Sequence, residues 1–294
     1  MRSLEYIDKP VSAEVLDRIA TVIGADKIKT EGENTVIVPT TQADVSAAVK
    51  AVIAAKGAIN TKNAKHHAAN EVLLDFSNMK DIEFIDTVNM TVKVQVGCRF
   101  EDLMNAVAEK GFMIGTSPAG KDATIEDFVY SELPGVGSYK YGTIKDNVFN
   151  VYAVDCNGGN IETGYDTLGY YMSGFNVTQT LTASAGRIAI ITAVTLKMVP
   201  AGVIKAEAYE FADADAMQAA LAKVAQEPSV KPFHISFNEK KAVFAFQGDE
   251  AFVDLDMAAM DAICEGATKI NDDLFTGIEG AECMCPKRPT FYIP

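Results

Sequence analysis

The residues best suited to chemistry gather in one short stretch, INTKNAKHHAAN, which spans residues 59–70 between two apolar, strand-like runs. It contains two of the three histidines of the chain, His66 and His67, preceded by Lys62 and Lys65, and it has no glycine. Imidazole and ammonium groups in one loop can hold a ligand, although lysine and histidine in a polar loop are also common on solvated surfaces. The loop is therefore either a ligand site or ordinary exposed surface.

Two further groups of side chains could take part in chemistry. The third histidine, His234, lies in FHISF, where strand alternation puts three apolar residues on one face and His234 with Ser236 on the other. A single strand histidine is more often structural than catalytic. Near the C-terminus, CMCP offers the sulfurs of Cys283 and Cys285, which are too few to hold zinc or an iron–sulfur cluster unaided. We predict no metal site.

The amino-acid composition limits which functions the protein can have. The 294 residues carry 26 Lys plus Arg against 40 Asp plus Glu, a formal charge of -14. Nucleic acid or an anionic membrane surface would be repelled over most of such a protein. Five cysteines without framework spacing suit a reducing compartment, and we find neither a signal-peptide core nor an apolar run long enough to span a bilayer. We expect a soluble, cytoplasmic protein that binds no nucleic acid.

The elements that must position the 59–70 loop form an α+β pattern. Periodicity predicts helices over 12–24, 42–56 and 99–111, each ended by a glycine, with Thr41 capping the second. The strand patterns are TVIVP, AINT, EVLLDFS, TVKVQVG, a hairpin VFNVYAVDCNGGNIETG with its turn at the NGG, and the long RIAIITAVTLKMVPAG.

The pattern changes after Gly202. From there the order is strand, helix, strand, turn, strand and a helix over about residues 251–270, which is typical of a small α+β unit with an antiparallel sheet. The chain therefore divides at about residue 202 into a larger and a smaller domain.

Four segments of the larger domain, in order, resemble the FAD-binding domain of the vanillyl-alcohol oxidase and p-cresol methylhydroxylase (PCMH) superfamily, most closely its glycolate oxidase and D-lactate dehydrogenase branch. They are VIVPTTQADVSAAVKAV, VLLDFSNMKDIEFID with TVKVQVGCRFEDLMNAVAEKGF, YGTIKDNVFNVYAVDCNGGNIETGYD, and ASAGRIAIITAVTLKMVP. The resemblance implies an α+β fold with a two-part, FAD-binding PCMH-type domain over residues 1–202 and a truncated α+β cap, like half of a ferredoxin-like fold, over 203–294.

The resemblance also assigns a role to the 62–67 stretch. In the family, an Arg-Gly-Gly-Gly-Thr-Ser loop closes its backbone N–H groups around the FAD pyrophosphate, and glycine lets the main chain approach the phosphates. Both lysines could supply charge in place of the lost amides, and berberine-bridge-type relatives carry a covalently bound flavin at the position of His66. Lys62 takes the arginine position, Asn63, Ala64 and Lys65 take the glycine positions, and His66 and His67 take the hydroxyl positions.

Two other cofactor segments of the family are altered. The family Thr-Ile-Gly-Gly is Thr124, Ile125, Glu126 and Asp127 here, so two carboxylates replace two glycines. Desolvated and unpaired carboxylates beside a pyrophosphate would be strongly unfavourable, so they must turn away or the phosphate is absent. A third segment, Gly-Ser-Glu-Gly-Thr-Leu-Gly-Ile-Ile-Thr in the family, becomes ASAGRIAIIT; it loses two glycines and the glutamate but keeps Ser184, Gly186 and Ile191.

The remaining candidates also come from the resemblance. In the family, a Tyr-Gly turn and an aspartate help to form the wall around the flavin, whereas the same residues could equally just hold a turn. A cap-domain histidine of the family faces the flavin and takes part in hydroxy-acid oxidation, which makes His234 the one candidate catalytic residue. The wall residues kept here are Gly135, Tyr141, Gly142 and Asp146.

Two hypotheses follow. The first is a subunit of an FAD-dependent oxidoreductase that oxidises a small 2-hydroxy acid and passes electrons to an iron–sulfur partner, beside a second flavin subunit, as in glycolate-oxidase-like complexes. The second is a non-catalytic, flavin-free structural subunit on the same fold within a larger redox complex. The glycine-free loops favour the second hypothesis, and the retained frame residues leave room for the first.

Overall fold

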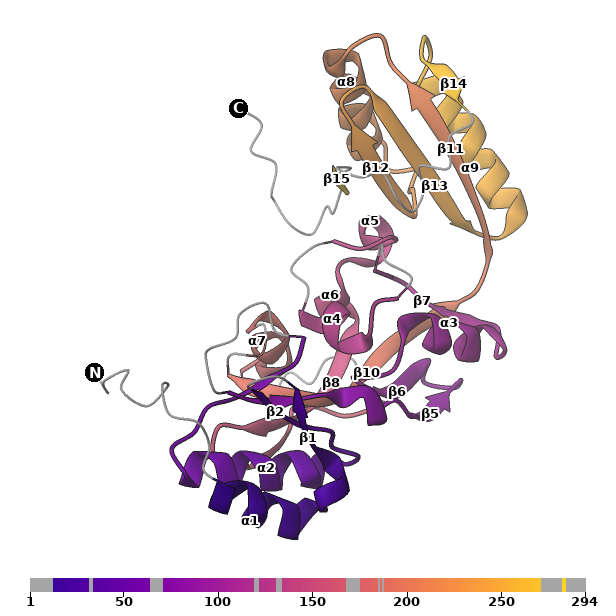
Figure 1. The fold of residues 1–294 in the computed structure, drawn as a ribbon. Helices are drawn as coiled ribbons and strands as arrows, with labels where there is room; N and C mark the ends of the chain where they lie inside the picture. The colour runs from indigo at the N-terminus through magenta and orange to yellow at the C-terminus, as the bar shows by residue number, and fades with distance from the viewer. Residues whose placement is uncertain are drawn as a thin grey trace. The chain divides into compact units, whose positions relative to one another are not determined.

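The computed structural model describes residues 13–31, 34–63, 71–118, 122–130, 134–167, 175–184, 186, 188–270 and 282–283. The chain divides into two compact units, which are described separately (Figure 1). The first comprises the described residues of Met1–Leu103, Asp122–Ser131 and Val148–Lys197, and the second comprises those of Met104–Lys121, Glu132–Asn147 and Met198–Pro294. Two internal segments thus group with the C-terminal part, and the division into domains at residue 202 stays a prediction.

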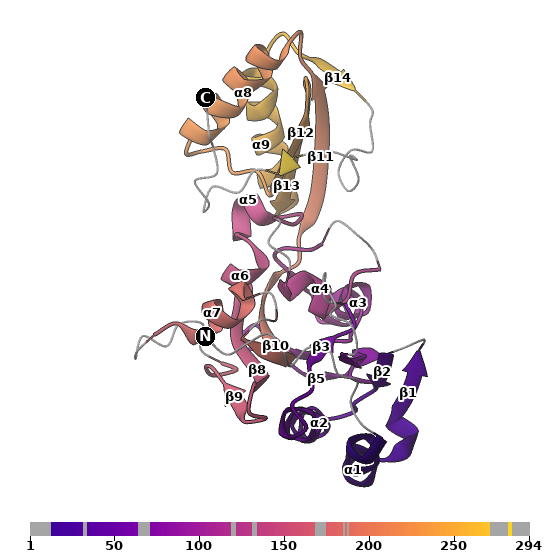
Figure 2. The same ribbon diagram turned by 60° about the vertical axis from the view of Figure 1, so that its left-hand side comes forward.

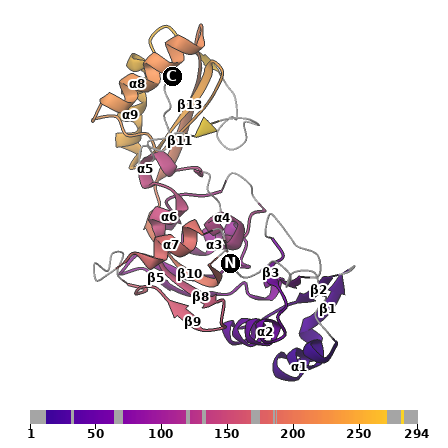
Figure 3. The same cartoon turned by 90° about the vertical axis from the view of Figure 1, so that its left-hand side faces the viewer.

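A small sheet and two helices open the first unit. The sheet has the order β1-β2-β4-β3, with β1 antiparallel to β2, and with β2 and β3 both parallel to β4. Helices α1 and α2 lie on one side of it (Figures 1 and 3), and α2 buries a valine-rich face. The elements are α1 (Ala13–Ile23), η2 (Ala25–Lys27), β1 (Ile28–Glu31), β2 (Asn34–Ile37), α2 (Gln42–Ala54), β3 (Ile59–Thr61) and β4 (Val72–Leu74).

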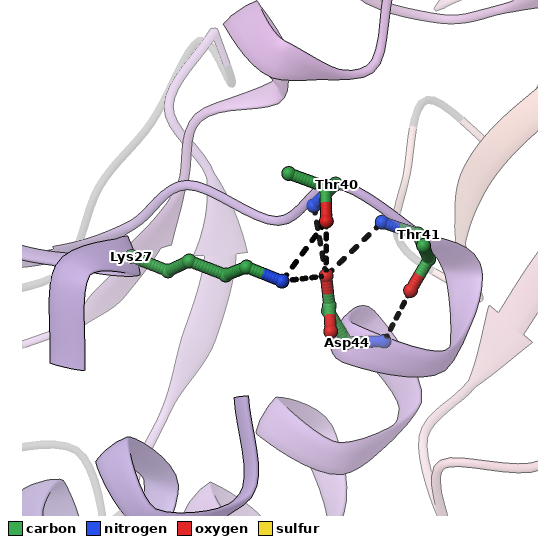
Figure 4. Close-up of polar contacts among 4 residues, drawn as sticks. All are labelled: Lys27, Thr40, Thr41 and Asp44. Atoms are coloured by element: carbon green, nitrogen blue, oxygen red, sulfur yellow. Dashed lines mark hydrogen bonds and ion pairs between the residues drawn. The ribbon is translucent and has the colours of Figure 1, made fainter. Parts of the chain in front are cut away.

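The start of α2 is fixed by a capping box whose N-cap residue, Thr41, is the one that the sequence predicts. The Asp44 N–H donates to Thr41 Oγ1 at 3.2 Å, and Asp44 Oδ2 accepts from the Thr41 N–H at 3.1 Å (Figure 4). The same Oδ2 accepts from the Thr40 N–H at 2.9 Å and pairs with Lys27 Nζ at 2.7 Å. Burial opposes ionisation of this carboxyl, but these donors outweigh it and lower the pKa of Asp44 to about 2.

Removing this carboxylate is expected to weaken the first unit. Because the pKa of Asp44 rises from about 2 to its ordinary 3.8 on unfolding, Asp44→Ala should lose about 2 kcal/mol of unfolding free energy at pH 7. The stabilisation by the ionised Asp44 is complete above pH 3.8 and disappears as the pH falls through about 2, so the unfolding free energies of the original protein and the variant should converge there. Urea unfolding at several pH values measures this. Asp215→Ala, at an exposed first-turn position, is the control, and an equal loss in both variants would contradict the assignment.

An antiparallel sheet forms the rest of the first unit. Its order is β5-β6-β10-β8-β9, and the end of β10 also pairs with β7, which belongs to the second unit together with Met198–Pro200. The predicted hairpin is present: Gly158 has φ +77°, and Asp155 Oδ1 accepts from the Asn157 and Gly159 N–H groups at 2.7 Å. The elements are η3 (Phe76–Asn78), β5 (Ile82–Asp86), β6 (Thr91–Gln95), α3 (Phe100–Ala108), β7 (Phe112–Ile114), α4 (Ile125–Tyr130), β8 (Val148–Asp155), β9 (Asn160–Glu162), α7 (Val177–Ala183) and β10 (Ala189–Pro200).

The C-terminal part of the second unit is a sheet of order β14-β11-β13-β12-β15 with α8 and α9 on one side (Figures 2 and 3). Its core includes Tyr209, Phe244 and Phe246. The elements are α5 (Ser138–Tyr141), α6 (Ile144–Asn147), β11 (Val203–Glu210), α8 (Ala214–Gln226), β12 (His234–Asn238), β13 (Lys241–Gly248), α9 (Glu250–Ile263), β14 (Thr268–Ile270) and β15 (Glu282–Cys283).

One predicted element is wrong in its length. The sequence pattern predicts a last helix over about residues 251–270, but α9 ends at Ile263 and β14 follows it in the chain. Gly266 has φ +93°, which a right-handed helix cannot include, and β14 pairs with the outer edge of β11.

No helix in the described part of the chain is long and apolar enough to cross a membrane.

Candidate functional site

A cavity of about 430 Å³ lies within the first unit. It is lined by residues from four segments: 62–63 after β3, 74–80 after β4, 97–102 after β6, and 124–126 at the start of α4. Two family cofactor segments that are far apart in the sequence therefore meet here. Of the predicted site residues, Lys62, Asn63 and Thr124 line the cavity, whereas Ala64, Lys65, His66 and His67 lie outside the described residues.

Glu126 is the most unusual group in the cavity wall. Its side chain is 2% exposed, and Oε2 accepts a hydrogen bond from Asn63 Nδ2 at 3.1 Å. Its other oxygen, Oε1, is buried without a hydrogen-bond partner among the described residues. Burial raises the pKa of Glu126 to about 7; the nearby Thr61 hydroxyl and the Asn63 amide, which is the hydrogen-bond donor to Oε2, oppose this rise, and the negative charges of Asp127 and Asp75 add to it. The carboxyl group therefore titrates near neutral pH.

The neighbouring Asp127 turns to the helix end instead. Its Oδ2 accepts from Thr124 N–H at 3.0 Å and from Thr124 Oγ1 at 2.7 Å, while the Asp127 N–H donates back to Thr124 Oγ1 at 3.2 Å. This reciprocal pair caps α4. The two carboxylates that replace family glycines thus differ: one caps a helix, and the other faces the cavity.

Five main-chain amides around the cavity are already engaged. A pyrophosphate site of the family kind needs several backbone N–H groups that point at the ligand. Here the Thr124 N–H is held by Asp127, and four others donate to main-chain carbonyls at 2.8 to 2.9 Å: those of Lys62, Gly97, Ile125 and Glu126. These five N–H groups therefore do not point at a ligand in the cavity.

The cations of the cavity are mostly paired. Lys62 Nζ lies 3.0 Å from Asp75 Oδ2 and 3.1 Å from Glu31 Oε2, and the bond to Asp75 is the main reason that the pKa of Lys62 is raised. Arg99 Nη2 lies 3.2 Å from Glu101 and 3.1 Å from Asp122. Counting these partners with the lining residues Glu126, Asp102 and Lys80, six carboxylates of the described residues stand against three cations. The described residues do not fit the pyrophosphate of FAD.

The predicted residues Gly135, Tyr141, Gly142 and Asp146 belong to the second unit, where three of them hold a turn. Gly142 has φ +79°, and Asp146 Oδ2 accepts from the Thr143 N–H at 2.8 Å. The Tyr141 hydroxyl donates to Gln247 Oε1 at 2.8 Å. These contacts account structurally for Tyr141, Gly142 and Asp146, and a role of the four residues beside a cofactor stays a prediction.

The predicted residues Ser184, Gly186 and Ile191 have local contacts in the first unit. Ser184 Oγ donates to the Leu181 carbonyl at 2.6 Å at the end of α7, and Gly186 has φ +79°. The Ile191 N–H donates to the Tyr130 hydroxyl at 3.0 Å. The predicted Ile125 is a buried core residue at the start of α4.

His234 lies inside the second unit and is 1% exposed. Its Nδ1 accepts a hydrogen bond from the Gly137 N–H at 3.4 Å. Burial lowers the pKa of His234 to about 4, so the imidazole is neutral at physiological pH. A catalytic role for it stays a prediction.

Sequence reasoning missed several residues of the cavity. Asp75, Gly97 and Arg99 follow the strands β4 and β6, in LLDFS and QVGCR. Polar or glycine residues directly after a strand are the signal that could have found them.

The chain is similar in sequence to known FAD-linked and hydroxy-acid-oxidising proteins over about half of its length or less. Residues 34–164 match the family model for an FAD binding domain. Over 154 residues the chain is 30% identical to the uncharacterized FAD-linked oxidoreductase Rv2280 of Mycobacterium tuberculosis (strain ATCC 25618 / H37Rv), covering 52% of this chain and 33% of the relative. It is 32% identical over 130 residues to the glycolate oxidase subunit GlcD of Bacillus subtilis (strain 168), covering 44% and 27%. A D-lactate dehydrogenase of Anaerostipes hadrus is 30% identical over 130 residues, with 44% and 27% covered.

Solved structures agree on the fold. An alkyldihydroxyacetonephosphate synthase superposes with a TM-score of 0.76 at 17% identity, covering 91% of this chain and 62% of its own. A substrate-bound p-cresol methylhydroxylase gives 0.73 at 16% identity, covering 87% and 65%. The PCMH-type α+β fold predicted from the sequence is confirmed, and the matched segment spans a third or less of the curated relatives. Residues 34–164 therefore match the family model for an FAD binding domain, and over 130 to 154 residues the chain is similar to an FAD-linked oxidoreductase, to glycolate oxidase subunit GlcD and to a D-lactate dehydrogenase.

Proposed function

We propose that this chain is a non-catalytic, flavin-free subunit of a larger redox complex. Glu126 carries the proposal: a buried carboxyl group occupies a position where the family has a glycine facing the cofactor. A glycine exposes main chain, whereas Glu126 fills space with a side chain that also binds Asn63. The similarity to GlcD, which is named as a subunit, supports membership of an assembly.

The charge of Glu126 is the smaller part of the argument. Its pKa of about 7 means that protonation can remove the charge at little cost near neutral pH. Protonation changes neither the bulk of the side chain nor the commitment of the surrounding amides to carbonyl and carboxylate acceptors. The obstacle to a pyrophosphate is therefore chiefly geometric.

The second candidate is an FAD-linked oxidoreductase subunit that acts on a small 2-hydroxy acid and passes electrons to an iron–sulfur partner. One observation favours it: a neutral Glu126 could donate a hydrogen bond from its own hydroxyl to a phosphate oxygen. FAD binding of this kind would require the protonated acid. It would therefore weaken about tenfold between pH 6 and pH 8, as the protonated fraction falls.

Flavin binding separates the two candidates. We expect the purified chain to show no flavin absorbance near 450 nm and no saturable quenching of FAD fluorescence at pH 6 or pH 8. A protein that retains stoichiometric FAD, or takes it up, contradicts the proposed function. Uptake at pH 6 that weakens at pH 8 would specifically support the second candidate.

A further inference from the structure

We propose that the cavity formed by residues 62–63, 74–80, 97–102 and 124–126 binds a small organic cation whose N–H groups, from a primary ammonium or a guanidinium, donate to Glu126 Oε1. The inference rests on the proposed function, because it requires that the cavity does not hold FAD.

The first observation is the unpaired oxygen. Glu126 is 2% exposed and lines the cavity, and Asn63 satisfies only Oε2. Oε1 has no donor in the part of the chain that the structure describes. A buried acceptor without a donor destabilises the protein, so a ligand that brings an N–H group gains that free energy on binding. Since the carboxylate accepts and cannot donate, the complementary group is a donor.

The second observation is the sign of the surrounding charge. Among the described residues, six carboxylates stand against three cations at the cavity and among the ion-pair partners of its cations. Lys62 and Arg99 each contact two carboxylates, and the whole chain has a formal charge of -14. A cation is attracted into such a site and an anion is repelled.

The third observation is the size and wall of the cavity. Its volume of about 430 Å³ lies within the roughly 300–1,000 Å³ of small-molecule sites. Leu74 and Phe76 add apolar surface to the polar groups, which would contact the carbon chain of an alkyl amine or alkyl guanidine.

The ligand requires the ionised form of Glu126. With a pKa of about 7, the ionised fraction rises about tenfold between pH 6 and pH 8, and a bound cation lowers this pKa and releases a proton below pH 7. Binding of a cation therefore strengthens with rising pH, opposite to binding of a phosphate by the neutral acid. Among the described residues, the charged groups around Glu126 are Lys62, Asp75, Lys80, Arg99, Asp102 and Asp127.

Calorimetric titration of the full chain with agmatine, which carries one guanidinium and one ammonium, tests the proposal. We expect saturable one-to-one binding that is about tenfold tighter at pH 8 than at pH 6, with protons released at pH 6.5 when buffers of different ionisation enthalpy are compared. Glu126→Gln should weaken binding at pH 8 at least tenfold. Glu265→Gln removes the same charge at an exposed position of the second unit and should leave binding unchanged.

Three results would each overturn the inference. The first is no saturable binding of agmatine to the unaltered chain at pH 8, the second is binding of agmatine to Glu126→Gln with equal affinity, and the third is weaker binding to the unaltered chain at pH 8 than at pH 6. If Glu126→Gln does not fold, the pH dependence and proton release of the unaltered chain decide. FAD titrated in parallel separates the two proposals. Binding of FAD would refute the proposed function, whereas binding of neither FAD nor agmatine would refute only this inference.

Discussion

A Gly97→Ala variant is expected to lose about 3 kcal/mol or more of unfolding free energy, or to fail to fold. A Cβ atom at Gly97 would lie 1.9 Å from the Phe76 carbonyl oxygen and 2.8 Å from that of Met79. Both are main-chain atoms, so neither can move aside as a flexible side chain would. The Gly97 N–H also donates to the Met79 carbonyl at 2.9 Å, which ties the two segments together. Relief of the clash must therefore separate two walls of the cavity.

Urea unfolding at pH 7 measures the loss, with Gly248→Ala as the matched control. A Cβ at Gly248 meets nothing within 4 Å, and its φ is not in the left-handed region, so this variant should stay within about 0.5 kcal/mol of the original. Equal stability of the two variants would mean that the turn at Gly97 can shift freely and that the cavity wall is not rigid there.

The parts of the fold that local chemistry decides could be predicted from the sequence. Thr41 caps α2 as expected, and Gly158 of the NGG turn has the positive φ that joins β8 to β9. The alternation of apolar and polar residues in TVKVQVG likewise predicts the buried valines of β6. Each of these features depends on residues that are near neighbours in the chain.

The end of α9 shows where local pattern fails. Apolar spacing continues past Ile263, so periodicity extends the helix toward residue 270. Tertiary pairing decides otherwise: Thr268–Ile270 add a strand to the edge of β11, and Lys269 forms an ion pair with Glu207 of that strand at 3.1 Å. Neither contact is visible in a window of neighbouring residues.

The candidate site could be predicted only in outline. The resemblance identifies the lost glycines at Asn63 and Glu126, but it cannot show that these two side chains bind each other, because 63 positions separate them. Burial of Glu126 and the engagement of the amides also arise from packing between distant segments. The sequence therefore predicts that the family site is altered, while its new chemistry depends on the three-dimensional arrangement.

Replacing Glu126 by glutamine is expected to stabilise the protein at pH 8 by about 2–3 kcal/mol. Burial raises the pKa of this carboxyl from 4.5 to about 7, so between these values the folded chain binds a proton that the unfolded chain has released. Stability of the original protein therefore falls as the pH rises from 4.5 to 7, and above pH 7 the full penalty of a buried charge remains. Glutamine has almost the same shape and no charge, so the unfolding free energy of the variant should not decrease with pH in this range.

Unfolding free energies at pH 5 and pH 8 measure the effect: the variant should gain little at pH 5 and most at pH 8. Glu265→Gln, at an exposed position, controls for the loss of one negative charge from an acidic chain. A variant less stable than the original at pH 8 would show that Glu126 is paired there by a donor already present in the protein. Agmatine at pH 8 should stabilise the original chain and leave the variant unaffected, because only an ionised carboxylate gains from a cationic partner.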